Sequence, residues 1–204
     1  MSNTRITIRP PADFDLARDV CSYGYFLLAP NHWDPDTRSL FRVLTLDAEP
    51  GTPAPASCRV TQNGSGLSAR FDRSLTRAEQ SQAREQIRRM LSLDTTEAEA
   101  RDFHKVDQRW KKSGRARLFR SPTLFEDIVK TVTSCNVAWP STITMNARLC
   151  EVLGGRSPSG GHAFPTPAKL ARTRPASLRA RCRVGYRDQR LVELAKLFRS
   201  GHID

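Results

Sequence analysis

Long apolar runs are missing from this chain of 204 residues, and so is an opening segment of the secretory kind. No stretch approaches the roughly 20 apolar residues that a membrane-spanning helix needs. Residues 1–11 are polar and contain the alternating sequence Arg-Ile-Thr-Ile-Arg from Arg5, which is typical of a short strand. We therefore expect no membrane partner and a protein that is not secreted, located in the cytoplasm with the nucleoid or in the nucleus.

Metal-binding and redox patterns are missing as well. The five cysteines are scattered, odd in number and include no Cys-x-x-Cys pair. That distribution favours a reducing compartment and argues against zinc and against a four-cysteine iron–sulfur loop. The four histidines are isolated from one another, and His32 lies in a Pro-Asn-His-Trp-Asp sequence that predicts a turn. We expect no metal and no cofactor.

Acidic residues are scarce in the second half of the chain. Residues 1–100 hold 12 Lys or Arg against 13 Asp or Glu, whereas residues 101–204 hold 21 against 8, so the net charge of +12 comes from one half. Codon bias could explain the excess of 27 arginines over 6 lysines, but it would enrich both halves alike. A polyanion such as DNA explains the asymmetry better, and the alternatives are a solvated basic surface or an acidic protein partner.

Two basic clusters lie in this half. Lys111 and Lys112 belong to the first, and Arg183 belongs to the second, which surrounds a Gly-Tyr-Arg sequence. Binding through such clusters neutralises phosphates and weakens steeply with salt. The clusters are Lys111, Lys112, Arg115, Arg117 and Arg120, and then Arg172, Arg174, Arg179, Arg181, Arg183, Arg187 and Arg190.

Residues 1–92 have the pattern of an antiparallel β domain with helices. The predicted strands cover 40–46, 58–62 and 67–71, and a loop is predicted at 50–55. Between the last two strands, Asn63-Gly64-Ser65-Gly66 predicts a hairpin, because Asn-Gly accepts positive φ at both turn positions. Phe14 to Cys21 predicts a short helix, and the capping box from Thr76 to Glu79 opens a longer one with a buried face. That face is Ala83, Ile87, Met90 and Leu91.

Residues 93–204 have the pattern of a helical domain. Ser121 and Pro122 predict the start of one helix, with Glu126 and Asp127 in its first turn where the helix dipole favours acids. A second helix restarts at Pro140 and is predicted to end at the paired glycines 154–155 in a left-handed stop. A tight turn at 184–187, predicted to expose an aromatic ring and a guanidinium, precedes a third helix. The predicted inner faces are Phe125, Ile128, Val129 and Val132; Ile143, Ala147 and Cys150; and Leu191, Leu194, Ala195 and Phe198.

Five pieces of this helical part keep one order and spacing over about 70 residues. They are Phe-Arg-Ser-Pro-Thr-Leu-Phe-Glu-Asp-Ile-Val from Phe119, Thr-Ser-Cys-Asn from Thr133, Ala-Arg-Leu-Cys from Ala147, Ala-Phe-Pro-Thr-Pro from Ala163 and Gly-Tyr-Arg from Gly185. Together they resemble the helix-hairpin-helix base-excision DNA glycosylases, closest to the branch with 8-oxoguanine and 3-methyladenine DNA glycosylases. The resemblance implies an α+β chain, in which an antiparallel β domain precedes an all-α glycosylase core.

The resemblance also implies a monomer that binds damaged double-stranded DNA and flips out a purine, 8-oxoguanine or an alkylated base, which requires filling the gap left behind. In the family, an asparagine and an aromatic enter the duplex and an arginine reaches the orphaned partner base. The matching positions are Asn136, Tyr186 and Arg187. An arginine suits that task because its planar fork can donate two hydrogen bonds to one base edge. Gly24 lies near the position of a glycine that lines the family's base pocket.

Each of these residues has a simpler interpretation. Asparagine is common at helix ends for its backbone conformation alone, so Asn136 need not enter DNA. Tyr186 has the alternative of a half-buried anchor whose hydroxyl finds a partner. Arg187 has the alternative of a solvated surface residue.

The chain also departs from the family's pattern. Ser141 stands where the 8-oxoguanine enzymes have a second arginine toward the partner base, which puts selection of an opposite cytosine in doubt. The Leu-Pro-Gly-x-Gly hairpin, the catalytic aspartate after it and the lysine of bifunctional members have no counterpart. We therefore expect a core that is incomplete at its C-terminus and contains no catalytic residue. A non-catalytic DNA-binding remnant of the family is the alternative to a glycosylase.

Overall fold

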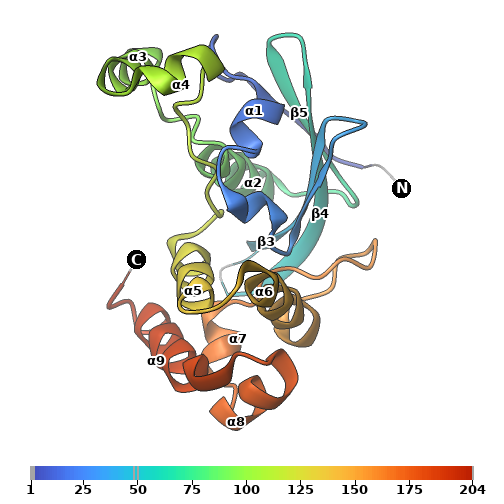
Figure 1. Ribbon diagram of the computed structural model, residues 1–204. Helices are drawn as coiled ribbons and strands as arrows, with labels where there is room; N and C mark the ends of the chain where they lie inside the picture. Colours follow the sequence, from blue (N-terminus) through green and yellow to red (C-terminus); the bar gives the residue numbers. More distant parts are fainter. Residues whose placement is uncertain (1–2, 48, 50, 204) are drawn as a thin grey trace.

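The computed structural model describes residues 3–47, 49 and 51–203 (Figure 1). An antiparallel sheet is built from the first part of the chain, and the second part is helical, so the predicted α+β class is confirmed. The helical group lies below one end of the sheet in the view of Figure 1. No helix among the described residues is long and apolar enough to cross a membrane.

The sheet has five strands in the order β1-β5-β4-β3-β2, and every neighbouring pair is antiparallel. The strands are β1 (Arg5–Ile8), β2 (Asn31–Asp34), β3 (Ser39–Asp47), β4 (Pro53–Asn63) and β5 (Gly66–Phe71). Alternate residues face the core, as in β1, where Ile6 and Ile8 are buried while Arg5 and Thr7 are exposed. The strand predicted from the alternation after Arg5 is confirmed as β1, and the predicted strands 40–46, 58–62 and 67–71 are confirmed with longer bounds.

Three details of the β domain differ from prediction. His32 lies within β2 and not in a turn, because it pairs with Phe41 of β3. β4 begins at Pro53, inside the predicted loop 50–55, of which residue 50 lies outside the described residues. In the hairpin, Asn63 pairs with Gly66 and belongs to the strand, so the turn residues are Gly64 and Ser65. Of these two, only Gly64 has positive φ, 56°.

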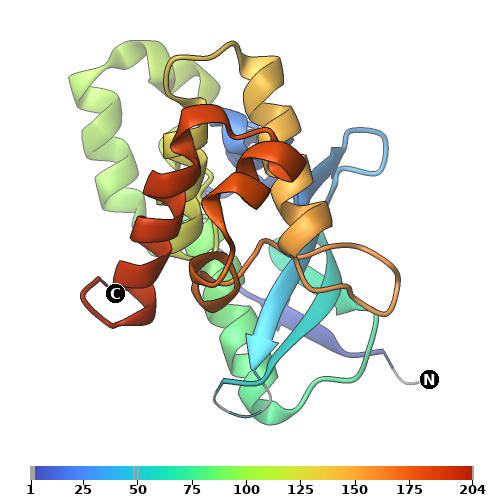
Figure 2. The same ribbon diagram turned by 90° about the horizontal axis from the view of Figure 1, so that it is seen from below.

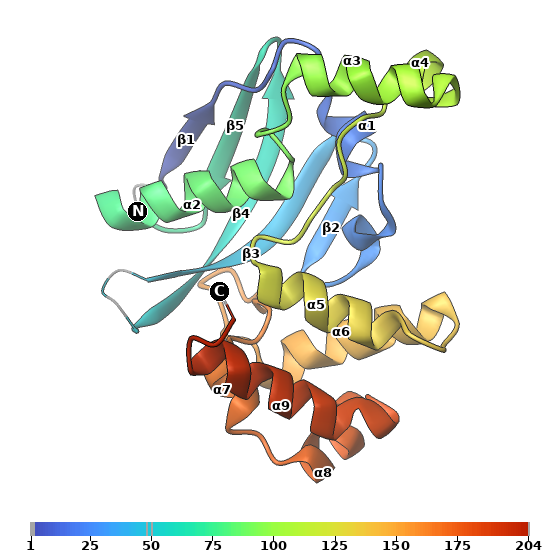
Figure 3. The same ribbon diagram turned by 90° about the vertical axis from the view of Figure 1, so that its left-hand side faces the viewer.

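Helices cover one face of the sheet and one end of it. The short helix α1 (Leu16–Val20) and the 3-10 turn η1 (Gly24–Leu27) precede β2, and α2 (Arg77–Met90) lies across the sheet (Figure 3). The predicted capping box of α2 is confirmed, with both the Thr76 and the Glu79 side chains bonded to backbone amides. Helices α3 (Glu97–Val106) and α4 (Gln108–Ser113) follow beyond the sheet.

The helical group is formed by α5 and all elements after it (Figure 2). They are α5 (Leu124–Ser134), α6 (Trp139–Leu153), α7 (Pro167–Ala171), α8 (Pro175–Ser177), the π-helical turn η2 (Leu178–Cys182), the 3-10 turn η3 (Gly185–Arg187) and α9 (Asp188–Arg199). The predicted inner face of α9 is confirmed for Leu191 and Ala195, which are fully buried, with Leu194 and Phe198 packed partly buried against the same core.

The start of α5 was predicted too early. Its N-cap is Thr123, whose hydroxyl accepts a hydrogen bond from the Glu126 amide at 3.3 Å. Ser121 lies before the helix, and its amide donates to the Asp127 carboxylate at 2.7 Å. The buried face also differs, because Ile128 is only half-buried while Lys130 is fully buried. Helix α5 contacts both the sheet and the other helices, so more than one of its faces is buried.

The end of α6 also differs from prediction. Gly154 has φ −70° and ψ 144°, an extended conformation and not a left-handed one. The reason for a glycine here is space: a Cβ atom would lie 1.9 Å from the Ala163 carbonyl oxygen. The chain after α6 folds back on itself, and the Ala163 amide donates to Gly155 O at 2.8 Å. On α6 itself Cys150 is buried as predicted, whereas Ala147 is half-buried.

Two clusters of buried apolar residues fill the molecule. The first joins the sheet, α1 and α2, and it includes Phe119. The second begins with Phe125 and joins α5, α6, α7, η2 and α9. Ile143 of α6 packs against the first cluster and not the second, in contrast to the inner face predicted for it. The change from one cluster to the other falls between Phe119 and Phe125.

Candidate nucleic-acid interface

Asn136 follows the C-terminus of α5 and is exposed. Its φ is 51°, a left-handed conformation that asparagine tolerates better than most residues. This explains why an asparagine stands at the end of α5 without reference to any ligand. Entry of Asn136 into DNA stays a prediction.

The Gly-Tyr-Arg turn is the 3-10 turn η3, and its two side chains have different environments. Tyr186 is 56% exposed, in accordance with the predicted exposed aromatic ring. Arg187 is only 4% exposed, so the prediction of an exposed, solvated guanidinium is wrong. The Arg187 guanidinium carbon lies 4.4 Å from the centre of the Tyr186 ring, which gives a cation–π contact.

Backbone carbonyl groups accept hydrogen bonds from the buried guanidinium of Arg187. Its Nε donates to Val132 O at 3.1 Å, and its Nη1 donates to Val184 O at 3.3 Å. Its Nη2 donates to the carbonyl of Cys135, the residue before Asn136. Among the described residues of the helix end, the Val132 carbonyl accepts only from the Cys135 amide, at 3.4 Å, and a cation at the C-terminus of a helix is favourable. Arg187 therefore joins the end of α5 to η3.

A cavity of about 420 Å³ lies between the α5–α6 turn and η3. Ser141, the position that departs from the 8-oxoguanine enzymes, lines this cavity and is exposed. Arg183 also lines it, is exposed and has φ 57°. The lining residues are Val137, Pro140, Ser141, Thr144, Met145, Arg183, Gly185 and Arg187.

Gly24, the predicted base-pocket glycine, lies in η1 close to the start of α6. A Cβ atom at this position would lie 3.0 Å from the ring of Trp139, so the indole fills the space directly in front of the glycine. Gly24 therefore lies next to Trp139, which follows shortly after Asn136 in the chain, although 112 positions separate Gly24 from Asn136 in the sequence. Its role in a base pocket stays a prediction.

Lys111 and Lys112 are both exposed on α4. Figures 2 and 3 place α4, the α5–α6 turn and the start of α9 along the same side of the molecule. The elements that carry the two lysines and the two predicted wedge residues therefore lie along one side, which we call the wedge face. It comprises α4, residues 135–139 and η3.

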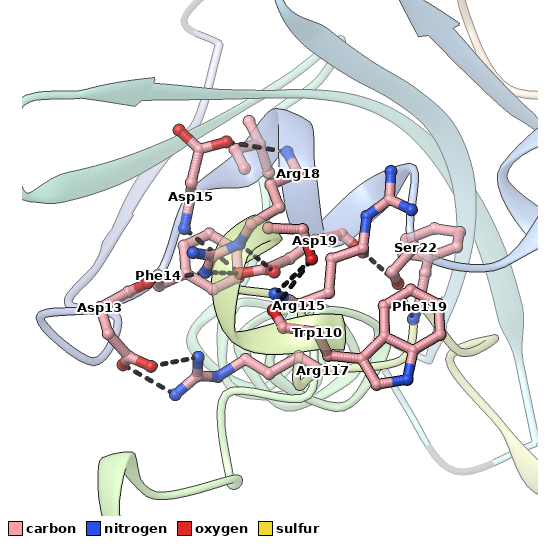
Figure 4. Close-up of polar contacts among 12 residues, drawn as sticks. Asp13, Phe14, Asp15, Arg18, Asp19, Ser22, Trp110, Arg115, Arg117 and Phe119 are labelled. Atoms are coloured by element: carbon pink, nitrogen blue, oxygen red, sulfur yellow. Dashed lines mark hydrogen bonds and ion pairs between the residues drawn. The ribbon is translucent and has the colours of Figure 1, made fainter. Parts of the chain in front are cut away.

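Two other members of the first basic cluster, Arg117 and Arg120, are paired with carboxylates. The Arg117 side chain is completely buried and donates to both carboxylate oxygens of Asp13 at 2.8 and 2.9 Å, as Figure 4 shows. This hydrogen bonding lowers the pKa of Asp13. Arg120 donates to the Asp94 carboxylate at 2.7 Å. Arg117 is therefore unavailable to a phosphate, in contrast to the predicted cluster, and Arg120 is engaged in a surface ion pair. Sequence could not show this, because Asp13 is 104 residues away from Arg117.

A buried ion network was not predicted at all. Glu126 of α5 accepts from Arg42 of β3 at 2.5 Å and pairs with Lys130, one turn later in α5, at 2.6 Å. Arg42 also donates to the Asn31 side chain at 2.6 Å. All three charged side chains are at most 3% exposed. Burial opposes ionisation of Glu126, but the two cations outweigh it and the pKa of Glu126 is lowered.

The same network holds the sheet against the helical group. Burial lowers the pKa of Lys130, although Glu126 acts in the opposite direction. The Lys130 ammonium also lies 5.5 Å from the centre of the Tyr25 ring, and the Tyr25 hydroxyl is 2.7 Å from that of Thr131. Burial raises the pKa of Tyr25 to about 12. The spacing of Glu126 and Lys130 on one helix turn was the only available signal, and it is also typical of a solvated surface pair.

Neither a family model nor a curated protein matches this chain. Solved structures do. A 3-methyladenine DNA glycosylase from Archaeoglobus fulgidus superposes with a TM-score of 0.71 at 18% identity, over 95% of this chain and 66% of that one. An 8-oxoguanine glycosylase/lyase from Clostridium acetobutylicum superposes with a TM-score of 0.68 at 16% identity, over 98% and 65%. This chain has the DNA glycosylase fold.

That fold includes the sheet as well as the helices. MBOgg1 in complex with a low affinity DNA ligand superposes over 100% of this chain with a TM-score of 0.70 and 17% identity. The chain covers 68% of that structure, so it spans about two thirds of the length of the proteins it resembles. The resemblance expected from the five sequence pieces is confirmed at the level of the fold. In the described part of the chain, no group of three or more His, Cys, Asp and Glu side chains is placed to hold a metal ion.

Proposed function

We propose that this protein binds damaged double-stranded DNA through the wedge face and holds open the gap left by a flipped purine. One observation carries the proposal: a single guanidinium contacts both the backbone beside Asn136 and the ring of Tyr186. The two segments that carry these exposed side chains, far apart in sequence, are thereby joined through one residue. Insertion of such side chains into a duplex fills the space of an extruded base.

The charge of the wedge face supports the same proposal. Helix α4, which carries two exposed lysines, lies on the same side as the α5–α6 turn and the start of α9, and the exposed Arg183 lies two residues before η3. DNA binding proteins obtain most of their affinity from such phosphate contacts, while other groups provide selectivity. We propose that the protein acts as a monomer in base-excision repair, in the cytoplasm or the nucleus. The substrate class is a damaged purine, 8-oxoguanine or an alkylated base.

A non-catalytic DNA-binding protein is the second candidate function. The observation that favours it is that the wedge face by itself provides groups for DNA binding, namely exposed lysines and two exposed wedge residues. The two candidates differ in one product. Incubation of the chain with duplexes containing 8-oxoguanine or 3-methyladenine, followed by chromatography for free base, would support a glycosylase if base is released. Lesion-selective binding without free base would support the second candidate.

Replacing Tyr186 by alanine tests the wedge. We expect affinity for a duplex with an abasic analogue to fall about tenfold, since an aromatic stacked on a base is worth that order of free energy. Affinity for undamaged duplex should change much less, because no gap is open there. Fluorescence anisotropy with both duplexes measures the two values, and Leu197→Ala, which removes an exposed side chain of α9 outside η3, is the control. Equal losses on both duplexes would exclude the wedge role.

Replacing Lys111 and Lys112 together by alanine tests the phosphate contacts. Each phosphate contact contributes about 0.9 to the slope of log affinity against log salt, so the slope should decrease in magnitude by about 1.8. Affinity should fall on damaged and undamaged duplex alike, because phosphate contacts do not read the lesion. Lys169 and Lys196, exposed on α7 and on the last turn of α9, provide a matched control pair. An unchanged slope would remove α4 from the interface.

A further inference from the structure

Arg187, expected from the resemblance to read the partner base, has its guanidinium engaged elsewhere. Each of its three nitrogens donates to a backbone carbonyl, and the Tyr186 ring covers one face of the group. Release of Arg187 toward DNA would leave the Val132 and Cys135 carbonyls without this partner. Release would lose these three hydrogen bonds and the contact with the Tyr186 ring together, so the observed arrangement is the more stable one in the absence of DNA. Arg187 is a structural link between the elements that carry Asn136 and Tyr186.

Arg183 has the opposite properties. It lines the same cavity of about 420 Å³ and is exposed, and no hydrogen bond or ion pair engages its side chain in the described residues. Its backbone is left-handed, with φ 57°, a conformation that non-glycine residues adopt rarely and at a cost. The turn after η2 therefore presents a free guanidinium at the edge of the cavity.

The other side chains that line the cavity offer few donors. Thr144 already donates its hydroxyl to Pro140 O at 3.0 Å, and Val137 and Met145 are apolar. Ser141 retains a hydroxyl, a weaker and shorter group than an arginine. Among the described residues that line this cavity, Arg183 is thus the cation without a partner.

We propose that the two arginines have different roles at the wedge face. Arg183 donates hydrogen bonds to the base left unpaired opposite the gap, and Arg187 is a positioning residue for Asn136 and Tyr186. This inference rests on the proposed function. The paired donors of a guanidinium match two neighbouring acceptors, such as O6 and N7 of guanine or N3 and O2 of cytosine. Adenine instead places its N6 amino donor beside the acceptors N7 and N1, and thymine places its N3–H donor between O2 and O4, so neither offers two neighbouring acceptors. Arg183 therefore favours guanine or cytosine opposite the gap.

Four duplexes that place each base in turn opposite an abasic analogue test the assignment of Arg183. The unmodified chain should bind the guanine and cytosine duplexes about tenfold more tightly than the other two. Arg183→Ala should bring all four affinities together at the weaker level. Arg187→Ala should weaken all four by a similar factor and keep their order. If Arg187→Ala removes the order and Arg183→Ala keeps it, or if the unmodified chain shows no order, the proposal is overturned.

Hydrogen exchange in the absence of DNA tests the positioning role separately. Arg187→Ala should speed exchange of the amides of residues 132–138 by about tenfold or more, since the carbonyls at the end of α5 lose their partner. Arg187→Lys keeps the charge but has fewer donors, so its exchange rates should lie between those of the unmodified chain and Arg187→Ala. Arg183→Ala should leave the exchange rates of these amides unchanged. Exchange unaltered in Arg187→Ala would refute the positioning role. If exchange behaves as expected but the unmodified chain binds abasic and intact duplex equally, the proposed function fails and the base assignment with it, while the structural link remains.

Discussion

Glu126→Gln is expected to lower the free energy of unfolding by about 3–5 kcal/mol. Glu126 is the only acid of the buried network and lies between Arg42 and Lys130. Its neutral amide would leave two cations buried without a counter-charge, and Lys130 is fully buried. Urea denaturation followed by circular dichroism measures the loss. Glu193→Gln, on the exposed side of α9, is the matched control.

The loss should depend on pH in a defined direction. The pKa of Glu126 in the folded chain lies below its ordinary value, so its stabilising contribution is fully present above that ordinary value. It disappears as the pH falls through the lowered folded-state pKa. The difference between the unmodified chain and Glu126→Gln should therefore be largest at neutral pH and shrink in acid. A difference below about 1 kcal/mol at pH 7 would show that solvent reaches the network.

A second substitution separates charge from packing. Adding Lys130→Met to Glu126→Gln removes one of the two unpaired cations while an unbranched side chain of similar length fills its place. The double variant should recover part of the lost stability, because an uncompensated buried charge costs more than the loss of a pair. Additive losses in the double variant would instead show that the residues act independently.

Gly154→Ala is expected to lower the free energy of unfolding by about 3 kcal/mol. Its Cβ would lie 1.9 Å from Ala163 O and 2.5 Å from Cys150 O. Both neighbours are backbone atoms, which cannot rotate away as a flexible side chain can. The segment of residues 155–163 would have to move away from the end of α6, and its hydrogen bonds with the sheet would be strained.

These hydrogen bonds would carry the effect of Gly154→Ala from the end of α6 to the sheet. Ser157 lies 2.7 Å from the Ser57 hydroxyl of β4, and the Ser159 amide donates to Asp72 at 3.0 Å. Gly66→Ala is the control, because the nearest atom to its Cβ would be at 3.8 Å and its φ is not positive. Thermal and urea denaturation of the two variants measure the difference. Equal stability of Gly154→Ala and Gly66→Ala would show that the segment 155–163 shifts freely.

Two contacts between the helical group and the β domain also position the wedge face. Glu126 and Lys130 precede Asn136 on α5, and the network fixes this helix against β3. Trp139, at the start of α6, packs against Gly24 of the β domain. A shift of the helical group relative to the sheet would therefore displace Asn136 and Trp139 together. Variants at the interior of the molecule should reduce gap-selective DNA binding as well as stability.

Patterns with a local physical cause were predictable from sequence. The Thr76–Glu79 capping box is formed by residues three apart, and alternation in β1 reflects one covered face of a sheet. The inner face of α9 follows from helical periodicity for the same reason. Prediction was less successful for α5, where Glu126 and Lys130 are polar yet buried. A helix in contact with two layers does not show a single apolar stripe.

The α+β order of elements, the basic second half and the five pieces whose order matches the DNA glycosylase fold could all be predicted from local sequence patterns. Which charges remain free depends on tertiary contacts. Arg117 is neutralised by Asp13, Arg187 is held by backbone carbonyls, and Arg183 is left exposed at the wedge face. Guanidinium groups are identical in sequence, and their availability depends on partners up to about a hundred residues away, which local propensity and periodicity cannot encode.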